Sequence, residues 1–514
     1  MEREPEVHIG LMWGISEVIV NLQGHWGVSD ARGLKRLEET RVKIRRINTS
    51  PAQVRYTVKL MECLSRKSIA TWLPEVKQIA VERNLSVLES GKLWSIHGKT
   101  WDARTRLIVA GNYSSESEAQ EAAEEWTKIL ENAFPDQKNL FWPQVEVLDS
   151  VDSDGVVEIR AGDQVFRSPL FRLEPLGRKS LLTIYNLVVG KDFHWEHKEN
   201  QVFNGSLAVL ADRHGGITLV NELPIETYLQ SVASSEATPG AGDSFIKAQA
   251  IAARSTVLST VSRHHRIDPF DLCAGDHCQC YYGVDQVDDR IAGLVETTRG
   301  MVRVYNHRPA DCRYSKSCGG RMESYDHVWG GEPVPYLVSG TCGGVKDHEI
   351  SSPEELLETP SNAWCNPKIH KYPRSLDHAR NTFRWKQEWL AGDLAANITT
   401  ELGTPVGFVR ELRPLTRGVS GRITRLQIIG SDRQVTIRGE LNIRKLLAKT
   451  HLPSSLFVIS TEGKGPDKFH FRGGGWGHGV GMCQLGGIAM AKSGALFERI
   501  LNAYYPGTTT ETLW

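Results

Sequence analysis

Two helices joined by a short turn are predicted for residues 221–258, NELPIETYLQSVASSEATPGAGDSFIKAQAIAARSTVL. Pro224 suits the first turn of a helix, and Leu229 and Val232 follow at helical spacing on one apolar face. The Thr-Pro-Gly run at 238–240 ends this first helix. Small residues line one face of the second helix, which lets it pack closely. We therefore expect the rest of the chain to be arranged around this helix pair.

Glu236 stands at the next position on the apolar face of the first helix, where the pattern predicts a core residue. Two interpretations are open. In the first, Glu236 is a helix-end residue that points back to solvent or pairs with a buried arginine such as Arg254. In the second, it is a partly desolvated carboxyl with a raised pKa, able to donate a proton near neutral pH. The local pattern alone does not decide between them.

Length, charge and hydropathy limit what kind of protein this can be. The chain has 514 residues, which suggests about two to four domains. It carries 61 Lys and Arg against 61 Asp and Glu, so its overall charge gives no argument for nucleic acid or an anionic membrane as a partner. No apolar run approaches the roughly 20 residues that span a bilayer. The N-terminus MEREPEVHIGLMWG lacks the order of a secretory signal, so the chain taken literally starts in the cytoplasm, although a trimmed signal or a misassigned start codon would look the same.

Residues 54–148 are predicted to form a small α+β domain in the order β-α-β-β-α-β. Its clearest helix is Ser115–Asn132, in which Ser115 caps the N-terminus and alanines line one face. The other helix, Ser68–Glu82, contains Pro74, which marks a kink or a later start.

Strand patterns flank this domain. Val7–Met12 is expected to pair with Val18–Leu22 as a hairpin, and residues 156–220 are strand-rich with Gly and Asp turns. Further along, a helix at Trp385–Ile398 is expected within an otherwise irregular segment at 346–407.

The motif DLCAGDHCQCYYG at 271–283 has the composition of a metal site. Cys273, His277 and Cys278 supply two thiolates and an imidazole within a short loop, and four nitrogen or sulfur ligands suit tetrahedral zinc. A disulfide plus a surface histidine, or free buried thiols, are the alternatives. The pattern leaves the fourth ligand open among Cys280, His264, His265 and water.

The chain has 9 cysteines, too few for a disulfide scaffold at this length. Cys63 and Cys483 stand alone in the sequence. Disulfides in an oxidising compartment remain open for the others outside the loop, which are Cys312, Cys318, Cys342 and Cys365.

Two glycine-containing motifs carry polar and aromatic side chains. RYSKSCGGRMESYDHVW at 313–329 would suit a sugar-binding cleft, although a plain loop fits equally well. FRGGGWGHGVGMCQLGG at 471–487 has glycines that let the backbone approach a ligand closely, and a glycine-rich turn with a buried histidine is the alternative. A phosphate loop is excluded at 486–493 because Ala491 stands where that motif needs glycine.

Several of these blocks come in a characteristic order: NELPIETYLQSVASSE, FIKAQAIAARS, DLC…HCQCYYG, SKSCGGRMESYDHVWGG, SGRITRLQIIG and GWGHGVGMCQLGGIAMAKSGALFERILNAYYPGT. In order and approximate spacing they resemble the SpoIID family (stage II sporulation protein D, with its LytB-type amidase-enhancer relatives). The resemblance covers about 165–514, and EVHIGLMWG…GHWGVSDARG is similar to the first strands of the family. Separately, TRLIVAGNYSSESEAQEAAEEW resembles the signature half of SPOR domains, which bind glycan strands stripped of stem peptides.

The resemblance implies an α+β fold, with a SpoIID-like catalytic domain of mixed strands and helices and a small β-α-β-β-α-β SPOR-like domain. We expect N-terminal strands of the SpoIID-like region at 1–50, the SPOR-like domain at 51–150 and the catalytic domain at 151–514.

The function implied is that of a lytic transglycosylase, which cleaves the MurNAc-GlcNAc bond of peptidoglycan strands lacking stem peptides and leaves a 1,6-anhydro product. The catalytic acid of the family falls in SVASSE, which assigns that role to Glu236. The zinc ligands fall at Cys273, His277 and Cys278 with an upstream histidine, His265 or His264, of which we take His265; the zinc would be structural. The substrate-binding residues expected are Arg254, Ser317, Tyr325, Trp476, His478 and Gln484.

Three departures from the family accompany the resemblance. The Cys-to-His spacing is slightly shorter than in sporulation members, Cys483 stands where serine is common, and no export signal is visible although the substrate lies outside the cytoplasmic membrane. We expect an extracytoplasmic location, in the cell wall or periplasm. The main alternative function is a non-catalytic, glycan-binding enhancer of a cell-wall amidase, and a third is zinc-dependent amide hydrolysis.

Overall fold

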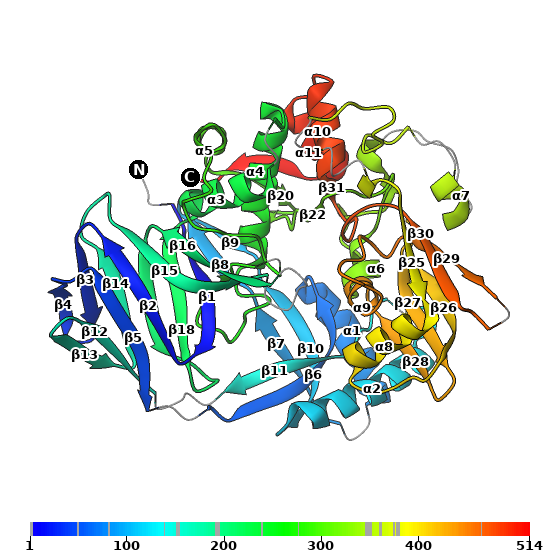
Figure 1. Cartoon of the computed structure of the whole chain (residues 1–514), viewed down its shortest axis with the longest axis horizontal. Coiled ribbons are helices and arrows are strands. Elements are labelled where there is room, and N and C mark those ends of the chain that lie inside the picture. The colour runs from blue at the N-terminus through cyan, green and yellow to red at the C-terminus, as the bar shows by residue number, and fades with distance from the viewer. Residues whose placement is uncertain are drawn as a thin grey trace. The chain divides into compact units, whose positions relative to one another are not determined.

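The computed structural model describes residues 4–48, 51–80, 83–137, 139–150, 155–190, 196–237, 240–275, 277–344, 352–358, 362–373, 376, 381–463 and 465–514. Helices and strands are mixed throughout, which confirms the predicted α+β class (Figure 1). The chain divides into two compact units. The first comprises Met1–Ala237, Ala253–Asp311 and Thr510–Trp514, and the second comprises Thr238–Ala252 and Cys312–Thr509. The boundary predicted at residue 150 is therefore not where these units divide. No helix among the described residues has the length and apolar character needed to cross a membrane.

The first unit is built on β-sheets whose strands come from both sides of the 54–148 segment. Among the described residues, their orders are β19-β1-β18-β17-β14-β3-β4 and β13-β12-β5-β2-β15-β16. The strands concerned are β1 (Glu6–Ile15), β2 (Glu17–Gln23), β3 (Trp26–Asp30), β4 (Gly33–Arg36), β5 (Arg41–Asn48), β12 (Val156–Ala161), β13 (Gln164–Ser168), β14 (Leu170–Pro175), β15 (Leu181–Val189), β16 (His197–Phe203), β17 (Ser206–Ala211), β18 (Ile217–Pro224) and β19 (Leu272–Cys273).

The predicted hairpin between Val7–Met12 and Val18–Leu22 is wrong. Strand β1 pairs antiparallel with β18, whereas β2 pairs with β5 and β15, so the two strands belong to different sheets. Only Ser16 separates them, and a hairpin connection normally needs at least two residues. The chain therefore passes from one sheet to the other at this point, and the partners of β1 come from far along the sequence.

The segment between these strands forms its own antiparallel sheet, in the order β11-β6-β10-β7. The predicted β-α-β-β-α-β order is confirmed, with one addition: a separate hairpin, β8-β9, stands between β7 and β10. Gly91, at φ +98°, lies between β7 and β8, and this backbone conformation favours glycine. The elements are β6 (Val54–Cys63), α1 (Arg66–Ile79), β7 (Leu85–Ser90), β8 (Leu93–Ile96), β9 (Lys99–Asp102), β10 (Thr105–Tyr113), α2 (Glu116–Ala133) and β11 (Gln144–Ser150).

The helices of this segment form where the sequence predicts them. Ser115 accepts a hydrogen bond from the Glu118 backbone and caps α2, which buries Trp126 in the core against the sheet. Helix α1 begins after the cap Ser65 and tolerates Pro74 in its interior. The order of strands matches that of a split β-α-β fold, while the likeness to SPOR domains remains a prediction.

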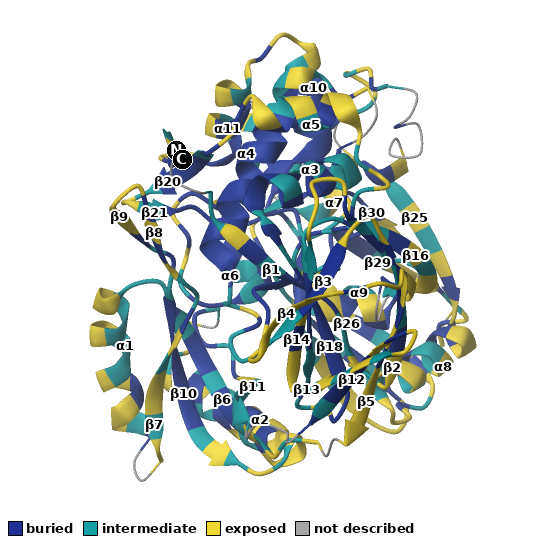
Figure 2. Cartoon of the chain, turned by 90° about the vertical axis from the view of Figure 1, so that its left-hand side faces the viewer, coloured by how far each residue is buried: buried dark blue, intermediate teal, exposed yellow. Residues whose placement is uncertain are grey.

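The predicted helix pair is confirmed as α3 (Ile225–Glu236) and α4 (Asp243–Thr260). Pro224 precedes α3 as its N-cap, and Leu229 and Val232 on the apolar face are fully buried. Helix α4 is buried over most of its length (Figure 2), which its alanines and Ser255 permit. The rest of the first unit holds α5 (Asp289–Glu296), β20 (Met301–Tyr305) and β21 (Arg308–Pro309), and strand β32 (Thr509–Thr512) pairs beside β20.

The second unit has its core around two small antiparallel sheets, β25-β30-β29 and β26-β27-β28. Trp385–Leu390, predicted as the start of a helix, is instead strand β25, paired along its whole length with β30, and the helix follows as α8. Several residues of the 346–407 segment lie outside the described part of the chain. The elements are β22 (Tyr314–Ser315), β23 (Arg321–Met322), α6 (Tyr325–Trp329), β24 (Gly340–Thr341), η1 (Cys342–Gly344), α7 (Pro353–Glu358), β25 (Trp385–Leu390), α8 (Ala391–Leu402), β26 (Val409–Arg417), β27 (Ile423–Gly430), β28 (Gln434–Arg438), α9 (Glu440–Leu446), β29 (Phe457–Glu462), β30 (Lys468–Gly473), β31 (Met482–Cys483), α10 (Gln484–Lys492) and α11 (Phe497–Tyr504).

Candidate functional site

Glu236 is the last residue of α3 and its side chain is half-buried. The turn that carries it is tied to its own helix, because the Ser234 hydroxyl donates to the Gln230 carbonyl at 2.7 Å and the Ser235 hydroxyl to the Ser231 carbonyl at 2.9 Å. These bonds hold the last turn of the helix in shape. The carboxyl is thus placed at a fixed, partly accessible helix end.

Arg254 does not pair with Glu236. Its guanidinium forms a two-point ion pair with Glu226, at 3.0 Å from Nε to Oε1 and 2.6 Å from Nη2 to Oε2. Glu226 also accepts hydrogen bonds from the Gly300 backbone at 3.0 Å and the Trp514 indole at 3.1 Å. Both members of the pair are buried, so Arg254 offers no atom to a substrate. The predicted substrate-binding role of Arg254 is therefore wrong, as is the interpretation of Glu236 as its partner.

The four residues predicted as metal ligands come together in the first unit. The ligand atoms of His265, Cys273, His277 and Cys278 all lie within 4.8 Å of one another, with His277 Nδ1 at 3.8 Å from Cys273 Sγ and 3.7 Å from Cys278 Sγ. Ligands around a tetrahedral zinc ion with two sulfurs and two nitrogens lie about 3.4 to 3.8 Å apart. The buried Nε2 of His265 makes no hydrogen bond to any described residue, while Asp268 holds Nδ1 at 2.8 Å. The donor set and this orphaned nitrogen fit a zinc ion, and Asp268 would orient the ring.

The loop at 271–283, called the Cys loop here, and the segment just after it each make one hydrogen bond to α3. The Tyr228 hydroxyl donates to the Gln279 side chain at 3.3 Å, and the backbone N–H of Asp288 donates to the Ser234 hydroxyl at 3.1 Å. Ser234 stands two residues before Glu236. The Gln279 contact therefore holds the first turn of α3, and the Asp288 contact holds the last turn, near Glu236.

The glycine-rich turn of the second unit presents one exposed ring. Trp476 is 37% exposed, stacks with His451 at 4.8 Å and forms a backbone bridge with Ser317. His478 is partly exposed, and its Nδ1 accepts a hydrogen bond from the Val480 backbone at 3.0 Å. Burial lowers the pKa of His478 to about 3, and nearby arginines add to this effect. The imidazole is therefore neutral near neutral pH.

The other residues predicted to bind substrate in this unit are buried. Ser317 is fully buried, and Tyr325 and Gln484 are 6% and 5% exposed. Their predicted contact with a substrate is corrected to a supporting role: Ser317 holds the turn through its bridge to Trp476, and Gln484 begins α10.

Glu323 was missed by the sequence analysis. Its buried carboxylate accepts hydrogen bonds from the Ser420 hydroxyl at 2.6 Å and the Ser324 backbone at 3.0 Å, and it lies 2.9 Å from His327 Nδ1. Burial would raise the pKa of Glu323, but these hydrogen bonds outweigh it and hold the pKa below its usual value. The Glu-x-x-x-His spacing was the signal, since residues four apart meet at a helix end.

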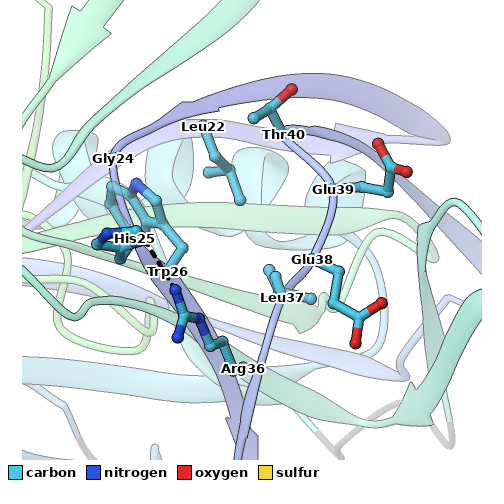
Figure 3. A pocket seen from close by; sticks show the side chains of 9 residues that line it. All are labelled: Leu22, Gly24, His25, Trp26, Arg36, Leu37, Glu38, Glu39 and Thr40. Carbon is cyan, nitrogen blue, oxygen red and sulfur yellow. Dashed lines mark hydrogen bonds between the residues drawn. The ribbon is translucent and has the colours of Figure 1, made fainter.

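A pocket of about 570 Å³ lies apart from all predicted site residues, between strands at the start of the first unit (Figure 3). Arg36 and His25 hydrogen-bond at 3.0 Å on its wall. None of the residues discussed above lines it, so we assign it no part in the chemistry. Its lining is Leu22, Gly24, His25, Trp26, Arg36, Leu37, Glu38, Glu39 and Thr40.

Comparison with known proteins finds similarity over parts of the chain. Residues 213–305 match the stage II sporulation protein (SpoIID) family, and residues 323–481 match a domain of unknown function, DUF8618. The chain is 29% identical over 290 residues to an uncharacterized protein of Brachyspira hyodysenteriae, covering 56% of this chain and 67% of that protein. It is 26% identical over 288 residues to the amidase enhancer of Bacillus subtilis, covering 51% of this chain and 37% of that protein. It is 24% identical over 303 residues to the stage II sporulation protein D of Bacillus subtilis, covering 56% of this chain and 75% of that protein.

Proposed function

Because this chain belongs to the SpoIID/LytB family, whose members place it in cell-wall biology, we propose that it cleaves peptidoglycan glycan strands as a lytic transglycosylase. The observation that carries the proposal is the position of Glu236, a half-buried carboxyl at a firmly held helix end. The substrate would be strands lacking stem peptides, and the protein would act outside the cytoplasmic membrane, where such strands lie.

Glu236 supplies both proton transfers of this reaction. As the acid it donates a proton to the glycosidic oxygen between N-acetylmuramic acid and N-acetylglucosamine, and the bond from that oxygen to the muramic anomeric carbon breaks. As the carboxylate it then takes the proton of the muramic C6 hydroxyl, whose oxygen closes the 1,6-anhydro ring. The carbonyls at the C-terminal end of α3 favour the neutral acid before the reaction, because the helix dipole is negative there.

A single carboxyl is sufficient because the sugar provides its own nucleophile. A glycoside hydrolase would need a second carboxylate on the opposite side of the bond. The two acidic residues that precede Glu236 on α3 and β18 are engaged: Glu226 in its buried pair with Arg254, and Glu222 in a 3.0 Å ion pair with Arg172. This engagement supports the transglycosylase over the hydrolase.

The metal centre would have a structural role beside α3. Zinc bound by His265, Cys273, His277 and Cys278 would supply a cross-link of the loop, since four protein ligands leave no position for water or substrate. The loop would then hold the first turn of α3 through Gln279, and Asp288, just after the loop, would hold the last turn. Chemistry at zinc is not part of the proposal, which separates it from a zinc-dependent amidase.

Exposed Trp476 and neutral His478 are the residues we retain as contacts for the glycan. An indole face packs against sugar rings. In the neutral imidazole of His478, Nδ1 accepts from the Val480 backbone, so the N–H at Nε2 is the group that would donate to a sugar hydroxyl. The 54–150 segment would add glycan affinity if its likeness to SPOR domains holds.

The test is a digest of purified sacculi whose stem peptides have been removed by an amidase. The full chain and its Glu236→Gln variant are compared, with products separated and weighed by mass spectrometry. The matched control is Glu296→Gln, because Glu296 also ends a helix, α5, but pairs with Arg299 on the surface. We expect 1,6-anhydro-muramic products from the wild type and the control and none from Glu236→Gln, which should bind strands normally. Full activity of Glu236→Gln would disprove the assignment.

The second candidate is an enhancer of a cell-wall amidase, favoured by the similarity to the Bacillus subtilis amidase enhancer. In that case the protein alone leaves glycan strands intact, and it raises the rate of stem-peptide release when a cell-wall amidase is added. Measuring both products in one digest separates the two functions.

A further inference from the structure

Four cysteines from separate segments of the second unit meet in one buried cluster. Cys318 follows the β22 strand, Cys342 begins η1, Cys365 lies in a loop and Cys483 ends β31. All four are fully buried, and their sulfur atoms lie within 4.8 Å of one another. Four free thiols this close together in a protein interior are the arrangement expected of metal ligands.

We propose that Cys318, Cys342, Cys365 and Cys483 bind one zinc ion as a tetrathiolate site, distinct from the Cys/His centre of the first unit. The Sγ atoms of Cys318 and Cys365 lie 3.7 Å apart. Sulfurs on a tetrahedral zinc ion lie about 3.8 Å apart, since each Zn–S bond is about 2.3 Å. A disulfide requires about 2.05 Å. An iron–sulfur cluster would hold some of the thiolates further apart, because the four would be shared between two or four irons.

The surroundings of the sulfurs are those of metal-bound thiolates. The Sγ of Cys483 accepts backbone N–H hydrogen bonds from Cys318 at 3.3 Å and from Gly486 at 3.4 Å. The Tyr504 hydroxyl lies 3.3 Å from the Sγ of Cys342. A Cβ built on Gly486 would stand 2.6 Å from that sulfur and 2.1 Å from the Tyr504 oxygen, so the helix can approach the cluster only with glycine at this position. Donors of this kind stabilise and orient metal-bound thiolates.

Two arginine side chains lie near the four cysteines. Four thiolates with one Zn²⁺ leave two negative charges in excess, which a buried site must compensate. Arg384 interacts electrostatically with Cys365 and Cys318, and Arg422 interacts with Cys318. Arg384 is fixed by hydrogen bonds to backbone carbonyls, including those of Gly319 and Leu356, and Arg422 donates to the Cys318 carbonyl at 3.2 Å. Arg384 thus offsets part of the negative charge of the proposed site, and Arg422, which also faces Glu323 and Glu440, adds to it.

The site would close long loops of the chain. Its ligands span residues 318 to 483, so metal binding fixes segments that secondary structure alone leaves far apart. Cys318 follows Ser317, whose backbone pairs with Trp476. The zinc would therefore hold the glycine-rich turn in place. With four protein ligands it is closed to substrate, and its role is structural.

The test measures metal content of the full chain, purified without added metal, by mass spectrometry under native and denaturing conditions. We expect about two zinc ions per wild-type chain. Cys365→Ser should keep about one, bound at the Cys/His centre, and Cys273→Ser should also keep about one, bound at the tetrathiolate site. The control is Cys312→Ser, because Cys312 is as buried as Cys365 and is not one of the four; this variant should keep about two. A zinc that responds only to Cys365→Ser supports this site even if the Cys/His centre binds no metal or Glu236 proves not to be catalytic.

A second measurement needs no variant. Cobalt exchanged into the wild type should show the visible absorption of a tetrahedral tetrathiolate, displaced to lower energy from that of a site with two sulfurs and two nitrogens. Alkylation of the unfolded chain without reductant should modify all four cysteines. Disulfides among them, bound iron, or a wild-type zinc content that Cys365→Ser leaves unchanged would overturn the proposal.

Discussion

Glu226 and Glu236 lie ten residues apart on one helix and differ in burial and in partners. Glu226 is enclosed with Arg254, while Glu236 is half-buried at the helix end. Sequence patterns identified Glu236 as unusual on its apolar face. They did not identify which carboxylate Arg254 binds, because both positions face the interior and only the folded structure fixes the distance.

The buried pair makes a prediction about stability. Replacing Glu226 with Ala leaves the Arg254 guanidinium buried without a counter-charge, which should lower the free energy of unfolding by roughly 3–5 kcal/mol. Glu222→Ala is the control, because the Arg172 side chain opposite it is 45% exposed, and it should cost less than about 1 kcal/mol. Urea denaturation of both variants measures the difference. Equal effects would show that the pair with Arg254 is not a buried charge pair.

His478 makes a prediction about pH. Its pKa is about 3 in the folded protein and 6.5 without the fold, so the unfolded chain takes up a proton that the folded chain does not. The contribution of His478 to stability is therefore complete above pH 6.5 and is lost progressively as the pH falls towards 3. Replacing His478 with Asn should flatten the stability curve over this range relative to wild type, measured by denaturation at each pH. The surface residue His25, changed to Asn, should leave the curve as it is.

At the scale of elements, the helices were the most predictable part. Helices α2, α3 and α4 each repeat apolar residues at helical spacing between clear caps or breakers, and this information is local. Strand β1 was assigned the wrong partner because its pairing with β18 spans about two hundred residues, which no local pattern encodes. Strand β25 was taken for a helix start because its two tryptophans fit either periodicity.

The link between the Cys loop and α3 predicts what metal removal does. A strong chelator should raise hydrogen exchange in residues 264–283 and in the first turn of α3, because Gln279 of this loop bonds to Tyr228 there. Helix α2, in its own core, should be unaffected and is the internal control. Unchanged exchange at the Cys loop after chelation would contradict the zinc-linked loop.

At the scale of the whole molecule, the family could be recognised from the order of motifs, and the comparisons bear this out. The cluster of four cysteines could not be predicted, since its members are spread over 165 positions and carry no ligand spacing. The sequence analysis considered only disulfides among three of them. The division into two units was also missed, because residues 238–252 of the second unit are embedded in the sequence of the first.

The central claim is that glycan strands are cut without water, through one carboxyl. It is tested most directly by digesting stem-peptide-free sacculi with the wild-type chain in oxygen-18-labelled water. We predict muramic products that carry a 1,6-anhydro ring and no label, because the C6 hydroxyl replaces water as the nucleophile. Reducing ends that carry oxygen-18 would contradict this claim and identify a hydrolase. Uncut strands would also contradict it and would favour the amidase-enhancer function.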